Sequence, residues 1–265
     1  MTRRGTELPV AALFLLGVAA FCWLVTADRM EGMDMGPGTE LGSFGWFAGV
    51  WAVMMAAMML PSLVPMAAAY AQRARGDAGI VTARSLAGTP LFVIGYLLPW
   101  VAVGAVAWPL IEGVRDLDPT YLRWDGGGRY VAAAVLAGAA LYQLTPQKAT
   151  CLTHCRESQW LAREWSPGPA GALRLGVEHG AFCIGCCWAL MAALFALGVM
   201  SVTWMVVIAA LIAAERLLPR RGPVRGASVA LLLALALGVG FFPDQVPGLT
   251  VPASMPPSAS MPMSM

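Results

Sequence analysis

The sequence predicts an all-α membrane protein, a bundle of about seven transmembrane helices. Of its 265 residues, 58% are hydrophobic and only 12% are charged, whereas soluble domains carry about 25% charged residues. The charges group between apolar runs that approach or exceed the roughly 20 residues needed to cross a bilayer. No glycine-rich phosphate loop, ATPase phosphorylation sequence or basic patch interleaved with aromatics is present. ATP-driven pumping by this chain alone and nucleic-acid binding are therefore excluded.

Seven apolar segments are expected to form the transmembrane helices. The first follows Arg3 and Arg4 like a signal peptide, but its length of about 18 residues favours an uncleaved helix. The second contains Pro61 and Pro65, which are expected to kink or open it. The segments are 9–27, 44–70, 89–111, 130–144, 177–198, 202–218 and 227–242.

The distribution of positive charge predicts an N-in, C-out topology. With the N-terminus inside, all of the 17 Lys and Arg residues lie in inner segments except Arg29, Arg115, Arg123 and Arg129. Cytoplasmic loops of membrane proteins carry such an excess of Lys and Arg. The longest inner loop, 147–175, is polar, and its part from Cys151 to Trp165 is predicted to form a short amphipathic helix on the cytoplasmic face.

Cysteine and histidine are concentrated around this loop. Both histidines and five of the six cysteines lie between positions 151 and 187. On helices, their spacing of three or four residues places most of each group on one face. The two groups are expected to meet at the inner ends of the fourth and fifth helices, where thiolates and imidazoles suit Cu(I) or Zn(II). The candidate ligands are Cys151, His154, Cys155, His179, Cys183, Cys186 and Cys187.

Methionine is the second source of soft donors. Met54, Met55, Met58 and Met59 precede the two prolines of the second helix. Further methionines lie in the first outer loop (Met30, Met33 and Met35) and in the C-terminal tail. Thioether sulfur suits Cu(I) in an oxidising compartment, so outer methionines and inner thiolates would form a graded series of copper ligands. Flexible hydrophobic packing is the alternative interpretation of these methionines.

Three functions remain open at this point. The first is soft-metal binding, most simply Cu(I) with zinc as the alternative, for copper handling, delivery or transport. The second is a membrane oxidoreductase, or a subunit of one, that uses a metal or thiols. The third is a metal-stabilised scaffold for a partner protein. The outer methionines favour the first function. It implies a membrane or periplasmic metal-handling protein as partner. It does not require an enzymatic activity.

The ordered motifs resemble a known family. WAVMMAAMMLPSLVP, GYLLPW, LYQLTPQKATCLTHCR and HGAFCIGCCWALM are similar to the bacterial family of predicted metal-binding integral membrane proteins, long classed as a domain of unknown function. The resemblance covers Trp46 to Pro219. It implies a multi-pass protein of the bacterial inner membrane with a metal site at the Cys and His positions, and it adds Met191 and the four methionines of the second helix to the site.

The resemblance also suggests how the chain is organised. Residues 1–43 comprise the first helix and the methionine-containing outer loop, and residues 44–219 form the family core of five helices with the Cys/His cluster. Residues 220–243 form the last helix. Residues 244–265 are a tail rich in Met, Pro and Ser that cannot bury enough apolar surface to fold alone and is predicted to be disordered.

Overall fold

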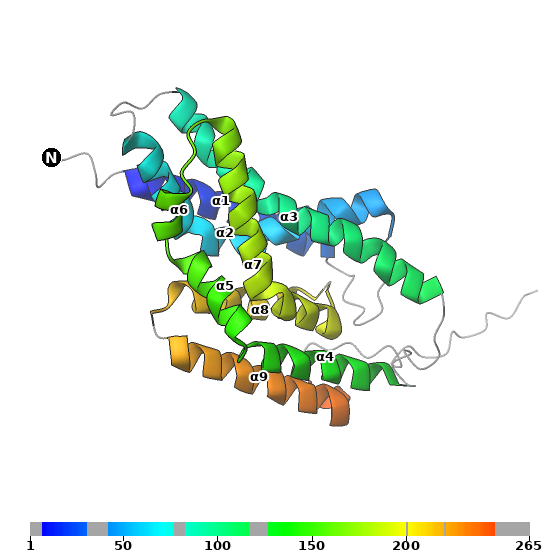
Figure 1. Ribbon diagram of the computed structural model, residues 1–265. Helices are drawn as coiled ribbons and strands as arrows, with labels where there is room; N and C mark the ends of the chain where they lie inside the picture. The colour runs from blue at the N-terminus through cyan, green and yellow to red at the C-terminus, as the bar shows by residue number, and fades with distance from the viewer. Residues whose placement is uncertain are drawn as a thin grey trace, which may run out of the picture.

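The computed structural model of the protein describes residues 7–30, 42–76, 83–116, 127–199, 201–219 and 221–246. Within these ranges the secondary structure is helical and contains no strand (Figure 1). The elements are α1 (Glu7–Met30), α2 (Phe44–Gly76), α3 (Ala83–Asp116), α4 (Arg129–Tyr142), α5 (Pro146–Arg156), α6 (Gln159–Arg163), α7 (Pro169–Leu197), α8 (Val202–Leu217), α9 (Arg221–Phe241) and the 3-10 turn η3 (Pro243–Gln245).

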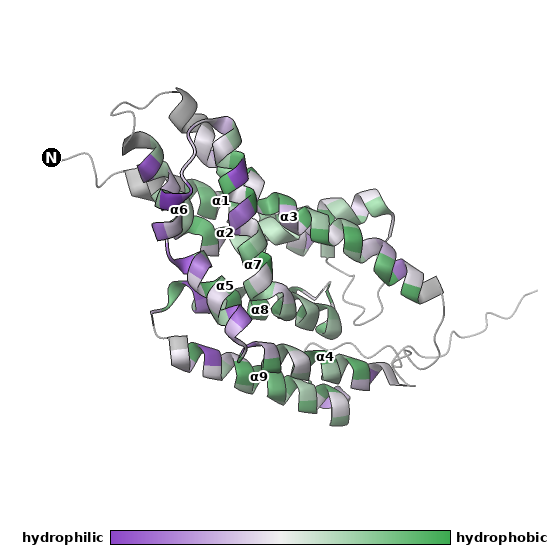
Figure 2. Cartoon of the chain, in the orientation of Figure 1, coloured by the Kyte–Doolittle hydropathy of each residue, from purple (hydrophilic) through white to green (hydrophobic). Residues whose placement is uncertain are grey.

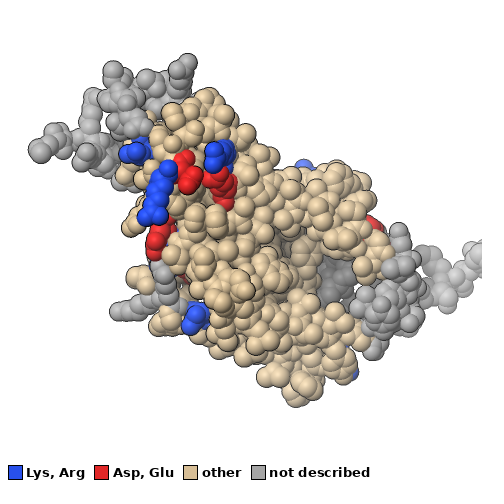
Figure 3. All heavy atoms as spheres, viewed as in Figure 1, with Lys and Arg blue, Asp and Glu red and all other residues tan. Residues whose placement is uncertain are grey.

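Five of the helices are long and apolar enough to cross a membrane. Their spanning segments are Ala12–Met30, Phe44–Ala74, Gly88–Val114, Pro169–Leu197 and Gly222–Phe241. The fourth and sixth predicted segments fold as α4 and α8, which are shorter, with 14 and 16 residues. Hydrophilic residues gather on α5, α6 and the first part of α7 (Figure 2). Charged side chains cluster over the same end of the molecule (Figure 3). The all-α class is confirmed and the five apolar helices fit a membrane protein, whereas the count of about seven transmembrane helices and the N-in, C-out topology stay predictions.

Several predicted boundaries are wrong. The predicted helix from Cys151 to Trp165 is two helices, α5 and α6, separated at Glu157 and Ser158. Helix α2 continues through both of its prolines, so they do not open it, and the expected kink stays a prediction. Met30, expected in the first outer loop, ends α1 and is buried, whereas Met33, Met35 and the tail methionines lie outside the described residues.

The start of α7 is the most consequential of these corrections. The Ser-Pro-Gly-Pro stretch suggests a loop in the sequence, but its second proline, Pro169, is the first residue of α7. Proline is well tolerated there because the N–H that it lacks would have no hydrogen-bond partner within the helix. Helix α7 therefore has 29 residues and a length of about 43 Å. His179 to Cys187 occupy its middle third, and not the inner end where the sequence placed them.

Small residues bring α3 and α7 into backbone contact. Gly176 and Gly180 are four residues apart on α7, and a Cβ at either would overlap a carbonyl oxygen of α3, that of Phe92 or Tyr96. This spacing of glycines lets membrane helices approach closely without a side chain between them. The contact places Tyr96 and Trp100 of α3 against the middle of α7.

The remaining helices complete the bundle around this pair. Helix α1 packs on α2, and α4 lies beside α9 (Figure 1). Helix α5 begins with Thr145 as its N-cap, whose side chain accepts a hydrogen bond from the backbone N–H of Lys148. It then packs against both α7 and α8, so four helices (α3, α5, α7 and α8) surround the cysteines.

Candidate metal centre

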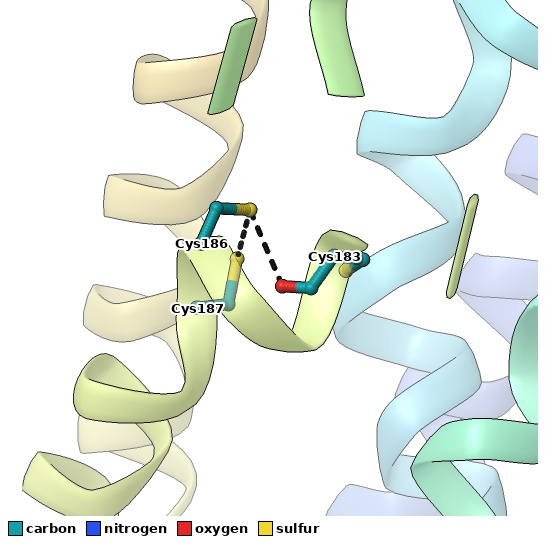
Figure 4. Close-up of side chains that lie close together, drawn as sticks. All are labelled: Cys183, Cys186 and Cys187. Carbon is teal, nitrogen blue, oxygen red and sulfur yellow. Dashed lines mark hydrogen bonds between the residues drawn. The ribbon is translucent and has the colours of Figure 1, made fainter. Parts of the chain in front are cut away.

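Three cysteines of α7 form the centre of the candidate site. Cys183, Cys186 and Cys187 are buried, and their Sγ atoms all lie within 4.8 Å of one another. The Sγ atoms of Cys186 and Cys187 are 3.3 Å apart, and the Cys186 thiol donates to the carbonyl oxygen of Cys183 at 3.2 Å (Figure 4). Their spacing of three and four residues on one helix produces this grouping, as the sequence predicted.

Helix α5 supplies a fourth sulfur. The Sγ atom of Cys155 is 3.8 Å from that of Cys186, and its side chain is also buried. The hydrogen bond with Cys186 and burial together raise the pKa of the Cys155 thiol. All four thiols are free of disulfides. We refer to Cys155, Cys183, Cys186 and Cys187 as the sulfur cluster.

Helix α3 contributes hydrogen-bond donors to the cluster. The Tyr96 hydroxyl is 3.1 Å from the Sγ atom of Cys183, and the Trp100 indole N–H donates to the same sulfur at 3.3 Å. A buried thiolate needs such donors because it has no water to solvate it. Tyr96 and Trp100, one turn apart, therefore present a polar edge to an otherwise apolar helix contact.

Arg216 of α8 brings a positive charge to the cluster. One guanidinium nitrogen, Nη2, donates to Cys186 at 3.4 Å and to Cys155 at 3.7 Å. The other, Nη1, donates to the Ser62 hydroxyl at 3.0 Å and to the Tyr96 hydroxyl at 3.1 Å. The side chain is only 6% exposed. The sulfur cluster is thus in direct contact with a buried cation.

A second set of polar contacts fixes α5 to the end of α8. Lys148 and Glu215 form a buried ion pair of 2.6 Å. Arg156 donates to the carbonyl oxygens of Glu215, in the last turn of α8, and of Leu218, its C-cap residue, at 2.6 and 2.7 Å. Carbonyls at a helix end have no partner within the helix, so these bonds satisfy them. They position Cys155 and Arg216 together.

The two histidines flank the indole ring of Trp160. His154 stacks between Trp160 and Phe182, with ring centroids 4.8 and 3.6 Å away, and the centroid of His179 is 5.8 Å from that of Trp160. The Nε2 atom of His154 and the Nδ1 atom of His179 are buried without a hydrogen-bond partner. Burial lowers the pKa of His154, an effect that the Glu178 carboxylate opposes, so its imidazole favours the neutral, ligand-competent form.

His154 also lines a cavity on the surface of the bundle. The cavity has a volume of about 470 Å³. Its walls come from α5, α6 and the segment between them: Ala149, Thr150, Thr153, His154, Glu157, Gln159, Trp160 and Arg163. His154 therefore borders this cavity, and the next residue of α5, Cys155, belongs to the sulfur cluster.

Cys151 is the most accessible of the cysteines in this region. Its side chain is half-buried, and burial raises the pKa of its thiol. It lies against Gly185 of α7, where an added Cβ would be 2.7 Å from its Sγ atom. Glycine at this position of the motif thus allows Cys151 to approach the helix that carries the three central cysteines.

The predicted methionine ligands lie in the hydrophobic core. Met54, Met55, Met58 and Met59 of α2 and Met191 of α7 are each at most 4% exposed. Ser62, one turn after Met59, donates to the Met59 carbonyl oxygen and accepts from Arg216, which connects this part of α2 to the edge of the sulfur cluster. A role of the methionine sulfurs in metal binding stays a prediction.

A comparison with known families identifies the chain. The model of the PpoB2 family, described as a copper chaperone, matches residues 48–239, which is most of the sequence. The chain belongs to this copper chaperone family. The match extends through most of α9, beyond the core of 44–219 expected from the motifs. Searches of curated proteins and of solved structures found no match.

The donor set fits a soft metal ion such as copper. A metal–thiolate bond is about 2.3 Å long, so two sulfurs on one ion lie at most about 4.6 Å apart. The Cys186–Cys187 and Cys155–Cys186 separations of 3.3 and 3.8 Å are within this limit. Thiolates select Cu(I) and Zn(II) among the common ions, and the copper chaperone family favours copper.

Several residues at the centre were missed by the sequence analysis. Arg216 was counted only as an inner positive charge, and Tyr96 and Trp100 entered only as part of the GYLLPW motif. One signal was available: Glu215 and Arg216 fall inside the apolar segment 202–218, and a charged pair within a membrane segment indicates a functional or paired site. The contact of Arg216 with sulfur follows from helix packing and has no sequence signal.

Proposed function

We propose that this protein binds Cu(I) through the sulfur cluster and passes the ion to or from another copper-handling protein. The observation that carries the proposal is the meeting of four free thiols in the core of a copper chaperone family member. Cys183, Cys186 and Cys187 are the primary ligands, and Cys155 joins them from α5. Thiolate sulfur is the donor that Cu(I) prefers. The five helices that are long and apolar enough to cross a membrane support a site within a multi-pass protein.

The cavity beside His154 is the proposed exchange route. An ion that enters this cavity first meets His154 and then the thiols of α5, where Cys151 is accessible and Cys155 belongs to the cluster. Each transfer replaces one copper–donor bond by another, so copper remains Cu(I) throughout and no electron acceptor is needed. His179, one turn before Cys183, supplies a further neutral nitrogen on the same face of α7.

The methionines are proposed as weaker ligands on the far side of the cluster. Met54, Met55, Met58 and Met59 follow α2 toward Ser62, which contacts Arg216, and Met191 follows the cysteines on α7 by one turn. A neutral thioether holds Cu(I) less strongly than a thiolate. Copper arriving along α2 would therefore move toward the cysteines.

Metal content of the purified protein tests the proposal. The full chain is isolated in detergent under reducing conditions, supplied with Cu(I), desalted and analysed by inductively coupled plasma mass spectrometry. Wild type is compared with the triple variant Cys183→Ser/Cys186→Ser/Cys187→Ser. Cys22→Ser is the matched control because it replaces a buried cysteine of α1. We expect near-stoichiometric copper in wild type and control, and its loss in the triple variant.

Other outcomes would assign the site differently. Equal copper in wild type and triple variant would overturn the proposed ligands. Zinc retained in place of copper would indicate a closed structural site. Turnover of a quinone or phenolic substrate by the purified protein would favour a membrane oxidoreductase, and full function after replacement of His154 and Cys155 would favour a scaffold.

A further inference from the structure

Arg216 is an unusual neighbour for a site that binds a cation. Its guanidinium is buried and donates to two sulfurs of the cluster. A positive charge at this distance repels a metal ion unless the ligands bring more negative charge than the ion neutralises. The presence of Arg216 therefore constrains which charge state the loaded cluster adopts.

The carboxylate nearest to Arg216 in sequence is already engaged. Glu215 pairs with Lys148 at 2.6 Å, and both side chains are about 4% exposed or less. The partners of Arg216 include thiols and hydroxyls: Cys155, Cys186, Ser62 and Tyr96. A buried cation is costly unless an anion accompanies it. The thiols of the cluster can provide that anion, because a thiol that loses its proton becomes a thiolate.

Counting charges gives the arrangement that suits this position. When two of the four cluster thiols release their protons and bind one Cu(I), while the other two stay protonated, the copper–sulfur unit has a net charge of −1. A guanidinium beside this unit makes the whole neutral, which is the least costly state in a site shielded from water. The same copper–thiolate unit without Arg216 would be a buried anion whose charge nothing compensates.

We propose that Arg216 is the counter-cation of the copper-loaded cluster, a positioning residue that makes tight Cu(I) binding by thiolates possible in this buried site. The proposal rests on the proposed function and extends it to a residue that is not itself a ligand. Its planar group bridges α8, α5 and α7 through sulfur, and it reaches α2 and α3 through the hydroxyls of Ser62 and Tyr96. Its charge is the property that matters, more than its hydrogen bonds.

A pair of substitutions separates charge from hydrogen bonding. Arg216→Lys keeps the positive charge and loses the planar fork, whereas Arg216→Gln keeps donors and loses the charge. Arg174→Gln is the matched control, since Arg174 is an exposed arginine of α7 paired with Glu178. Cu(I) affinity is measured for each full-length protein in detergent by competition with bicinchoninate, a chromogenic Cu(I) chelator.

The expected order of affinities is wild type and Arg174→Gln together, Arg216→Lys close behind, and Arg216→Gln weaker by about tenfold or more. X-ray absorption at the copper edge provides a second readout. Copper that remains on Arg216→Gln should have fewer sulfur neighbours, because a neutral donor in place of one thiolate restores neutrality. A residue that only held the helices together would not change the ligand set in this way.

Two results would overturn the inference. In the first, Arg216→Gln binds Cu(I) as tightly as wild type; in the second, Arg216→Lys loses as much affinity as Arg216→Gln. Absence of Cu(I) binding by wild type itself would refute the proposed function, and this inference with it. If Arg216→Gln is not stably folded, Arg216→Met replaces it, because an apolar side chain of similar length removes the charge without leaving a buried polar group.

Discussion

The molecule contains two buried sulfur-rich regions that differ in their surroundings. On α7 the cysteines are in contact with the Tyr96 hydroxyl, the Trp100 indole and the Arg216 guanidinium. On α2 the methionines are just as inaccessible and belong to the same hydrophobic core, but no hydrogen bond between the described residues reaches their sulfur atoms. Sulfur content and burial are therefore alike, and hydrogen bonding to the sulfur atoms makes the difference. Hydrogen-bond donors around a buried sulfur can solvate its thiolate form when a metal ion has replaced the proton.

The same lesson follows from two neighbouring residues of α8. Glu215 has a full charge partner in Lys148, and the pair closes the contact between α5 and α8. Arg216, the next residue, turns to the thiols of Cys155 and Cys186. The charge of Glu215 holds α8 against α5, whereas the charge of Arg216 lies at the sulfur cluster.

The largest expected effect comes from removing one partner of the buried Lys148–Glu215 ion pair. Lys148→Met leaves the Glu215 carboxylate buried and unpaired, which should cost about 3–5 kcal/mol of stability. The double variant Lys148→Met/Glu215→Leu should recover most of this loss, since no charge then remains buried. Unfolding in mixed detergent micelles, followed by circular dichroism, measures both. A double variant as unstable as the single one would show that the pair does more than neutralise its own charges.

A smaller effect is expected from separating α3 and α7. Gly180→Ala places a methyl group against the Tyr96 carbonyl oxygen and should cost about 1–3 kcal/mol. The added methyl group should push α3 away from α7, which moves Tyr96 and Trp100 away from Cys183. Cu(I) affinity should therefore fall as well. Gly138→Ala in α4 is the control, because an added Cβ there meets nothing within 4 Å. Unchanged copper affinity in a destabilised Gly180→Ala protein would argue against a role of the α3 donors.

These contacts also mark the limit of what the sequence could predict. All seven predicted segments fold as helices, and five of these helices are long and apolar enough to cross a membrane, because hydrophobicity and length indicate membrane segments directly. Spacing on one helix predicted that Cys183, Cys186 and Cys187 would group together. The start of α7 was missed because Pro169 is equally compatible with a loop and with a first helical turn. The contact of Arg216 with sulfur depends on how α8 packs against α5 and α7, and no local pattern encodes it.

The smallest expected effect concerns the methionines and tests the comparison directly. Replacing Met54, Met55, Met58 and Met59 by leucine conserves volume and should cost less than about 1.5 kcal/mol at each position. Copper stoichiometry should stay at the wild-type value, because the thiolates hold the ion. The rate of loading from a soluble Cu(I) donor should fall several-fold if the thioethers supply weak intermediate ligands. Stopped-flow absorbance of the copper–thiolate band measures this rate.

Met205→Leu in α8 serves as the control for that experiment, since it removes a buried methionine from another helix. A loading rate equal to wild type would assign the methionines of α2 to packing alone, and the two sulfur regions would then differ in function as well as in surroundings. Copper loss as complete as in the triple cysteine variant would reverse the comparison and make the methionines primary ligands. Rate and stoichiometry together therefore decide whether the thioethers of α2 take part in copper binding.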